Sequence, residues 1–359
     1  MNQPRVSLAA DGLQLRPAEY AELLVELTRG RDLKPDRYGT EGPLPEFEER
    51  FALRMGKEKA IVMPTGTLAQ MLALAGLCRD RGRRVLVQRD SHIFSDTGDG
   101  AALIAGLTLV PLQDREAGFS REAVEAEVAR GKGYRIATPI GAIAIETPVR
   151  RWHGRRVADG DLADVTAYAR EAGIGLHLDG ARLFIASAFT GRDPRDYAEP
   201  FDTVYVSLYK YFNAPFGALV AGPAQLIDDL RQQRMRFGGA LMQFWQSALI
   251  AGHFLEGHLD GWRRAIAIGE AALSRLSASG LFAIERVPDG TNIFRLTVPG
   301  ADSESLERFR NEAEAAGLVL PKNEDGGFWA RVNQTWLRLE PEDIADRLIA
   351  AAKAASSRP

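Results

Sequence analysis

Short β-rich runs alternate with helical patterns along most of this 359-residue chain, and that alternation most constrains the fold. Phe47, Phe51 and Met55 repeat at four-residue steps before Gly56, which predicts an amphipathic helix that ends at a glycine. Strands separated by helices are typical of a parallel sheet covered by helices. The β-rich runs are KAIVM (59–63), RVLVQ (84–88), LTLVPL (107–112), YRIAT (134–138), AIAIE (142–146), IGLHLD (174–179), TVYVS (203–207) and GALVAG (217–222).

The pattern changes after about residue 250, where a long helix is followed by a second group of β-rich runs. A final helix opens with Pro341, Glu342 and Asp343, a favourable first turn, and is expected to end near Lys353. We expect an N-terminal segment over 1–40, a large domain over 41–250 and a small α+β domain over 251–359. The second group of runs is LFAIERV (281–287), TNIFRLTV (291–298) and TWLRL (335–339).

Charge and cysteine usage exclude several classes of protein. Lys and Arg total 45 against 48 Asp and Glu, so no overall positive field would recruit nucleic acid. The single cysteine, Cys78, excludes an internal disulfide framework and suits a reducing compartment. No run of apolar residues is long enough for a membrane span, so we expect a cytoplasmic protein without membrane or nucleic-acid partners. The basic runs 79–84 and 150–156 are interpreted as solvated loops, and the second could border a substrate entrance.

Three places in the large domain carry residues suited to chemistry. The first is the turn Thr65, Gly66 and Thr67, between the run 59–63 and an apolar helical pattern. Free backbone N–H groups at such a helix start can hold a phosphate, with threonine hydroxyls as further donors. A capped helix start without any ligand is the alternative interpretation.

The second place is Asp179, at the end of a strand predicted to be buried. Ligands of open α/β sheets bind at such carboxyl ends. A carboxylate there needs a partner, which could be a metal, a backbone cap or a cationic ring nitrogen. His177 would point to the same face of the strand, so a metal pair with Asp179 stays open, although no further ligand cluster lies nearby in the sequence.

The third place is Lys210, in the mostly apolar stretch VSLYKYFNAPFGALVAG that follows a predicted strand. A buried ammonium is costly unless it is paired or neutralised. A desolvated lysine is also a nucleophile for carbonyls and forms Schiff bases. Ser207 lies three positions earlier, so both side chains could reach one ligand. An ordinary surface lysine is the alternative.

The segment HLDGARLF (177–184) with the downstream SLYK (207–210) resembles the fold-type I pyridoxal phosphate enzymes, in particular the threonine aldolase and β-eliminating lyase family. The resemblance runs from RYGTEGPLPEFEERF (37–51) to WLRLEPEDI (336–344). It implies an α/β fold of the pyridoxal phosphate-dependent transferase type, as in aspartate aminotransferase. Such a fold has a large domain with a mostly parallel sheet and a small C-terminal α+β domain.

The resemblance also implies roles around the cofactor, pyridoxal 5'-phosphate. Lys210 would form the Schiff base and later act as a base. Asp179 would pair with the protonated pyridine nitrogen, which makes the ring an electron sink. Arg182 would lie near the phenolic oxygen, and His92 would stack on the ring near the substrate hydroxyl. The phosphate would be bound by Thr65, Gly66, Thr67 and Ser207.

Substrate contacts follow from the same resemblance. Arg338, in WLRL, would grip the amino-acid carboxylate, a bidentate task that suits a guanidinium. Glu146 matches a family glutamate near the ring, with a structural carboxylate at the strand end as the alternative. The family's next histidine is shifted or lost in ETPVRRWHG, where His153 is a candidate substitute.

The chain departs from the family pattern elsewhere. Ala10 stands before Asp11 where the family usually has a serine, so one expected carboxylate contact is missing. Tyr209 and Tyr211 flank Lys210 and crowd the site. Trp245 stands where the family has an arginine, which removes one phosphate or subunit-bridging cation.

The leading functional hypothesis is a lyase that cleaves a β-hydroxy-α-amino acid to glycine and an aldehyde. The alternatives are β-elimination, racemisation or transamination with the same cofactor, or a non-catalytic partner protein of this fold. Family members place each active site between subunits, so we expect a homodimer or homotetramer that acts on a small amino acid. The aromatic cluster of Phe237, Phe244 and Trp245 is interpreted as helix core or subunit interface.

Overall fold

The computed structural model describes residues 5–356 and divides into two compact units. The larger unit comprises residues 15–187 and 191–256. The smaller unit contains the N-terminal segment up to Gln14, residues 188–190 and the chain from Gly257 onward. The N-terminal residues therefore belong to the same unit as the C-terminal part of the chain.

A seven-stranded sheet forms the centre of the larger unit, in the order β2-β8-β7-β6-β5-β3-β4. Strand β8 is antiparallel to both of its neighbours, β2 and β7, and the other strand pairs are parallel, so the predicted mostly parallel sheet is confirmed. The strands are β2 (Lys59–Met63), β3 (Arg84–Gln88), β4 (Thr108–Leu112), β5 (Ile140–Glu146), β6 (Gly175–Asp179), β7 (Thr203–Ser207) and β8 (Ala218–Gly222).

Helices cover this sheet, and α3 (Gly66–Leu77) is central because it packs against β5, β6, β7 and β8. Its apolar residues meet Ile61, Met63 and Val220 of the sheet in one buried cluster. The other helical segments of the larger unit are α1 (Pro17–Thr28), α2 (Leu44–Met55), α4 (His92–Ser95), α5 (Gly100–Ala105), α6 (Arg121–Lys132), η1 (Arg150–Trp152), α7 (Asp159–Glu171), α8 (Leu183–Thr190), α9 (Pro194–Ala198), α10 (Ala224–Arg236) and α11 (Trp245–Leu255). The last three residues of α8, 188–190, are assigned to the smaller unit.

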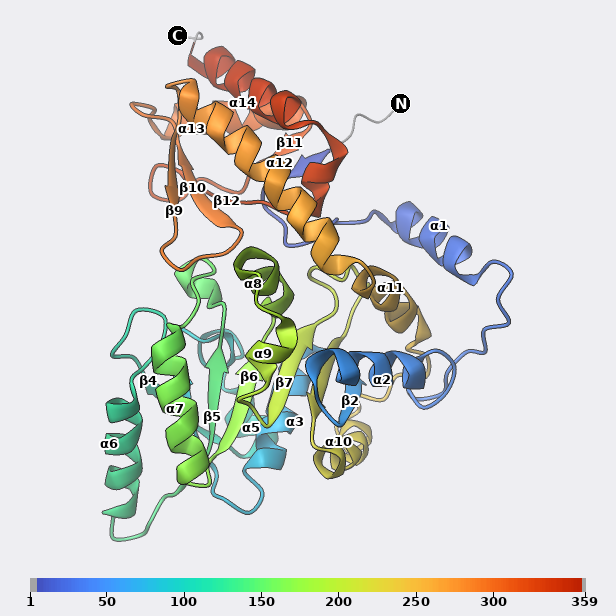
Figure 1. Ribbon diagram of the computed structural model, residues 1–359, viewed down its shortest axis with the longest axis vertical. Helices are drawn as coiled ribbons and strands as arrows, with labels where there is room; N and C mark the ends of the chain where they lie inside the picture. The colour runs from blue at the N-terminus through green and yellow to red at the C-terminus, as the bar shows by residue number, and fades with distance from the viewer. Residues whose placement is uncertain (1–4, 357–359) are drawn as a thin grey trace. The chain divides into compact units, whose positions relative to one another are not determined.

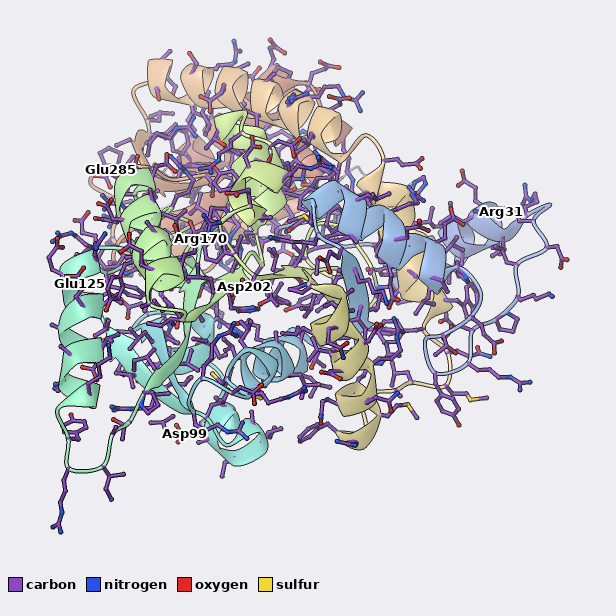
Figure 2. The ribbon with its side chains drawn as sticks, turned by 60° about the horizontal axis from the view of Figure 1, so that its bottom comes forward. Arg31, Asp99, Glu125, Arg170, Asp202 and Glu285 are labelled. Carbon is purple, nitrogen blue, oxygen red and sulfur yellow. The ribbon has the colours of Figure 1, made fainter. Side chains whose placement is uncertain are left out.

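Two of these helices, α6 and α7, lie side by side in both views (Figures 1 and 2). Figure 2 labels Glu125 on α6 and Arg170 on α7. Arg121 of α6 links the two helices. Its guanidinium bonds Glu125 of the same helix and lies 3.4 Å from a carboxylate oxygen of Glu171 on α7. Such exposed ion pairs contribute little stability, so packing of the buried apolar side chains must hold the two helices together.

The smaller unit has its own core, which mixes helices and strands as expected for an α+β domain. Strands β9 (Ala283–Arg286), β10 (Ile293–Thr297) and β12 (Phe328–Arg331) form an antiparallel sheet, and β1 (Val6–Ser7) pairs in parallel with β11 (Leu318–Val319). The helical segments are α12 (His258–Ala278), α13 (Ser303–Ala315), η2 (Gln334–Arg338) and α14 (Pro341–Ser356).

Local expectations differ from the structure at two places and agree with it at a third. The run 134–138 forms no strand, because Tyr134 and Ile136 are exposed in the loop between α6 and β5. The run 335–339 is mostly the 3₁₀ helix η2, and the strand β12 lies just before it. The helix that ends at Gly56 is confirmed, with that glycine in the left-handed conformation at φ 64°.

None of the helices within residues 5–356 combines the length and the apolar character that crossing a membrane requires.

Candidate active site

A cavity of about 340 Å³ brings together most of the residues predicted for the site. Its walls come from the ends of β5 and β6, the chain after β7, and the first turns of α3 and α4. All these elements belong to the larger unit. The predicted residues that line it are Thr65, Gly66, Thr67, His92, Glu146, Asp179, Arg182 and Lys210.

The sheet register explains why several of these side chains meet. Glu146 on β5 pairs with Asp179 on β6, which pairs with Tyr205 on β7. Residues directly opposite each other on neighbouring strands share a face of the sheet. The three side chains therefore form a row beneath α3 at the carboxyl ends of parallel strands, where ligands bind in such sheets.

Asp179 is buried and only half of its carboxylate is used. Its Oδ1 accepts a hydrogen bond of 3.1 Å from the backbone N–H of Ala181. Its Oδ2 is buried and has no hydrogen-bond partner among residues 5–356. An unpartnered carboxylate oxygen is costly to bury, so it implies a cationic or N–H group that a ligand supplies.

The first turn of α3 has the features of an anion site. Helix geometry leaves the N–H groups of Gly66 and Thr67 without acceptors inside the helix. Thr65 is the N-cap, and its Oγ1 accepts the N–H of Leu68 at 3.2 Å. The cap expected as an alternative is thus present, and it leaves the two earlier N–H groups directed toward the cavity end of the helix.

Glu146 connects three segments around the cavity. One carboxylate oxygen accepts the backbone N–H of His92 at 2.6 Å, and the other accepts that of Arg150 at 2.8 Å. The side chain of Gln88 bonds both the backbone N–H and the carbonyl oxygen of Glu146. Burial, followed by the nearby Asp179 carboxylate, raises the pKa of Glu146 to about 7. These contacts fit the structural interpretation of Glu146.

His92 begins α4 and is half-buried at the cavity. Burial lowers the pKa of its imidazole below the usual 6.5, Asp179 acts against this change, and Lys210 adds to it. The imidazole is therefore neutral at pH 7, the form that can accept a proton.

Lys210 is half-buried in the loop after β7 and lines the cavity. Its Nζ lies 5.8 Å from the ring centroid of Tyr209, which also lines the cavity and is half-exposed. Tyr211, on the other side in the sequence, is fully buried and is not part of the lining. Of the two tyrosines expected to crowd the site, Tyr209 lies at the cavity and Tyr211 does not.

Ser207 and His153 do not line the cavity. Ser207 is fully buried at the end of β7, and His153 follows η1 in a left-handed conformation at φ 49°. Arg338 belongs to the smaller unit, where its guanidinium donates to the carbonyl oxygens of Arg5 and Leu13 at 2.8 and 3.2 Å. The roles suggested for these three residues stay predictions.

The cavity also contains residues that sequence reasoning missed. Tyr205 lines the cavity but lies in an apolar β-rich run. Its one sequence signal is its position two residues before Ser207, which puts both side chains on the same face of the strand. Gln70 is 2% exposed, and its buried Oε1 has no hydrogen-bond partner among the described residues. Its signal was a polar residue one turn after Gly66 in an otherwise apolar helix. Arg150, from the basic run 150–156, lines the cavity as suggested for that run.

Within residues 5–356, no three His, Cys, Asp or Glu side chains gather in a way that could hold a metal ion. His177 lies one row below Asp179, and its Nδ1 is 2.8 Å from Oγ1 of Thr203. Burial lowers the pKa of His177 to about 3, so this side chain is a neutral part of the core.

The residues at the cavity fit pyridoxal phosphate. The unpartnered Oδ2 of Asp179 would hold a protonated ring nitrogen, and the first turn of α3 would hold the phosphate. Lys210 supplies the amine, and His92 supplies a flat ring at the same cavity. The unused carboxylate oxygen is the observation that distinguishes this fit from an ordinary capped turn.

Comparison with known proteins agrees with this geometry. Residues 29–297 match the family model described as beta-eliminating lyase. The low-specificity L-threonine aldolase 1 of Arabidopsis thaliana is 26% identical over 295 residues, which is 80% of this chain and 81% of that protein. The low specificity L-threonine aldolase of Escherichia coli O157:H7 is 26% identical over 222 residues, or 61% of this chain and 65% of that one.

The same fold is found among solved structures. The threonine aldolase of Leishmania major superposes with a TM-score of 0.73 at 15% sequence identity, covering 97% of this chain and 99% of that one. Because the family model spans most of the sequence, the chain belongs to the beta-eliminating lyase family, and it is a threonine aldolase-like lyase that depends on pyridoxal phosphate.

Proposed function

We propose that this enzyme cleaves a β-hydroxy-α-amino acid of the threonine or allo-threonine type to glycine and an aldehyde. The observation that carries the proposal is the meeting of His92, Lys210 and Asp179 at one cavity, with His92 in its neutral form. A neutral imidazole can accept the proton of a substrate hydroxyl, which is the proton that aldol cleavage must remove. The relatives named as threonine aldolases support the same reaction.

The reaction balances without a further reactant. His92 takes the proton from the β-hydroxyl, directly or through a water, the Cα–Cβ bond breaks, and the hydroxyl-bearing carbon leaves as the aldehyde. When bound, pyridoxal phosphate supplies the electron sink for the pair left at the α-carbon. Lys210 would move a proton at that carbon, and a proton returned there gives glycine.

Other residues orient the substrate in this proposal. Glu146 fixes the backbone at His92 and Arg150, so that the imidazole keeps its place over the cavity. Arg338 would bind the substrate carboxylate, a role supported by its position in WLRL alone. Tyr209 narrows the space beside Lys210 and would favour substrates with a small group on the β-carbon.

The first test is a substrate panel of threonine, allo-threonine, phenylserine, serine and cysteine, with glycine, aldehyde and pyruvate measured as products. The proposal predicts glycine and an aldehyde in equal amounts from at least one β-hydroxy amino acid. Pyruvate from serine or cysteine, with no cleavage of the β-hydroxy amino acids, would replace aldol cleavage by β-elimination.

The second test separates the role of His92 from general binding. His92→Ala should lower kcat for cleavage by about 10²–10⁴ if the imidazole takes part in proton transfer. Exchange of the glycine α-proton needs no hydroxyl deprotonation and should change much less. His253→Ala, an exposed histidine on α11, serves as the control. Equal loss of both activities in His92→Ala would reduce His92 to a ring-packing residue.

A further inference from the structure

Tyr205 is a buried residue of the cavity that no role above uses. It is 3% exposed, and its ring packs beneath α3 in the cluster that includes Met63, Ala69 and Val220. It nevertheless lines the cavity. Buried phenol groups normally find a hydrogen-bond partner, which at a cavity a bound ligand can supply.

The position of this hydroxyl is fixed by its contact with Gly66. A Cβ atom added to Gly66 would lie 2.2 Å from Oη of Tyr205, far closer than non-bonded atoms approach. The hydroxyl therefore stands against the backbone of the first residue of α3, beside the N–H groups of Gly66 and Thr67 that the helix leaves free. Any side chain at position 66 would displace it.

The hydroxyl is a donor in this place. Burial raises the pKa of Tyr205 well above its usual 10, and the Asp179 carboxylate raises it further. The phenol thus keeps its proton over the whole physiological range. Asp179 Oδ2 has no partner among residues 5–356, so the phenol does not serve that carboxylate, although the two residues are neighbours in the sheet row.

Ser207 lies on the same face of β7, two residues further along. It is fully buried and does not line the cavity, whereas Tyr205 does. The serine hydroxyl is close enough to the phenol to oppose part of the rise in its pKa. Tyr205 is therefore nearer to the cavity than Ser207.

We propose that the Tyr205 hydroxyl donates a hydrogen bond to the phosphate of the bound cofactor, and that Ser207, which does not line the cavity, does not reach the phosphate itself. The proposal rests on the cofactor, not on the reaction that the enzyme catalyses. Failure of the aldol cleavage assays would therefore leave it standing, and its own failure would leave the proposed reaction untouched.

The experiment compares pyridoxal phosphate with pyridoxal, which lacks the phosphate, as ligands of the apo-protein. Dissociation constants are obtained by absorbance titration for wild type, Tyr205→Phe and Ser207→Ala. A hydrogen bond to a charged group corresponds to a loss of about 10- to 100-fold in affinity, so Tyr205→Phe should weaken pyridoxal phosphate by that factor and leave pyridoxal unchanged. Tyr211→Phe, a buried phenol that does not line the cavity, is the matched control and should change neither.

Two outcomes would overturn the proposal. Equal weakening of both ligands in Tyr205→Phe, or no weakening of either, would show that the phenol only fills space beneath α3. Ser207→Ala decides independently, even if Tyr205→Phe does not fold. A selective loss of about 10- to 100-fold for pyridoxal phosphate in Ser207→Ala would assign the phosphate contact to the serine, whereas the proposal expects a loss below about threefold.

Discussion

Glu146 shows how a single buried carboxylate organises the site. Its two oxygens accept the backbone N–H groups of His92 and Arg150, and burial raises its pKa to about 7. Hydrogen bonds from backbone N–H groups favour the charged carboxylate, but burial opposes it more strongly here. The residue that fixes the backbone at His92 therefore titrates near neutral pH.

This residue gives a prediction on the pH dependence of stability. The ordinary pKa of the carboxyl, 4.5, applies in the unfolded chain, whereas the folded value is about 7. Between these values the folded state binds more protons than the unfolded state, so the contribution of Glu146 to stability falls as pH rises. Glu146→Gln cannot ionise. The free energy of unfolding of wild type, relative to this variant, should fall across that pH window.

Urea denaturation of the two apo-proteins at several pH values measures the difference. His92 is present in both proteins, so its own titration largely cancels. A difference that stayed constant or rose with pH would mean that the Glu146 carboxyl is already ionised near its ordinary pKa.

The sequence predicted the residues suited to catalysis better than the residues that support them. Asp179 and Lys210 could be found because the carboxyl ends of parallel strands meet at one edge of a sheet. Tyr205 could not be separated from the core, because a tyrosine in an apolar β-rich run usually fills space. Its role depends on a close contact with Gly66, and only coordinates show such a contact.

At the scale of elements, α3 combines a structural and a binding function in one turn. The Thr65 hydroxyl accepts the N–H of Leu68, and the N–H groups of Gly66 and Thr67 stay available for an anion. The same threonine was predicted to bind the phosphate. The geometry of the cap assigns its hydroxyl to the helix in the protein without a ligand.

This assignment predicts the effect of replacing the capping residue Thr65. Thr65→Ala should lower the free energy of unfolding of the apo-protein by about 0.5–2 kcal/mol, the usual cost of losing an N-cap hydroxyl. Thr65→Ser keeps the hydroxyl and should be close to wild type. Chemical denaturation of both variants tests the assignment, and equal stability of Thr65→Ala and wild type would contradict it.

Element prediction succeeded where local pattern and tertiary packing agree. The strands of the large sheet carry apolar side chains on two covered faces, and their runs were visible in the sequence. The run 134–138 has the same residue types but no neighbouring strand, so Ile136 is 80% exposed. The 3₁₀ helix η2 begins after Asn333, whose side chain accepts the N–H of Thr335 at 2.9 Å. That capping residue was the signal that the run 335–339 is not a strand.

At the scale of the whole molecule, an apolar surface beside the cavity supports the expected homo-oligomer. We define this apolar rim as Tyr38, Met235, Phe237 and Met242, which are all well exposed. The backbone N–H of Tyr38 bonds the carbonyl oxygen of Met242, so the two segments adjoin. The segment after α10 also packs on the first turn of α3, since a Cβ at Gly239 would lie 2.5 Å from Leu68. Exposed apolar groups that adjoin in this way mark interaction surfaces.

We propose that this rim packs against a second copy of the chain. Of the predicted aromatic cluster, Phe244 is fully buried against Phe216 and belongs to the core, whereas Phe237 faces outward. Phe237→Glu should therefore shift the sedimentation profile toward the monomer, with association weakened about tenfold or more. Ile136→Glu, at an exposed apolar residue outside the rim, is the control. An unchanged oligomer in Phe237→Glu would place the interface elsewhere.

The central claim is that this chain holds pyridoxal phosphate through Lys210 at the cavity beneath α3. Borohydride reduction of the protein loaded with the cofactor, followed by peptide mass analysis, tests it most directly. The account predicts a yellow protein whose reduced cofactor is found on the peptide that contains Lys210, and no label in Lys210→Ala. A label on another lysine, or no bound cofactor after reconstitution of the wild type, would contradict the account.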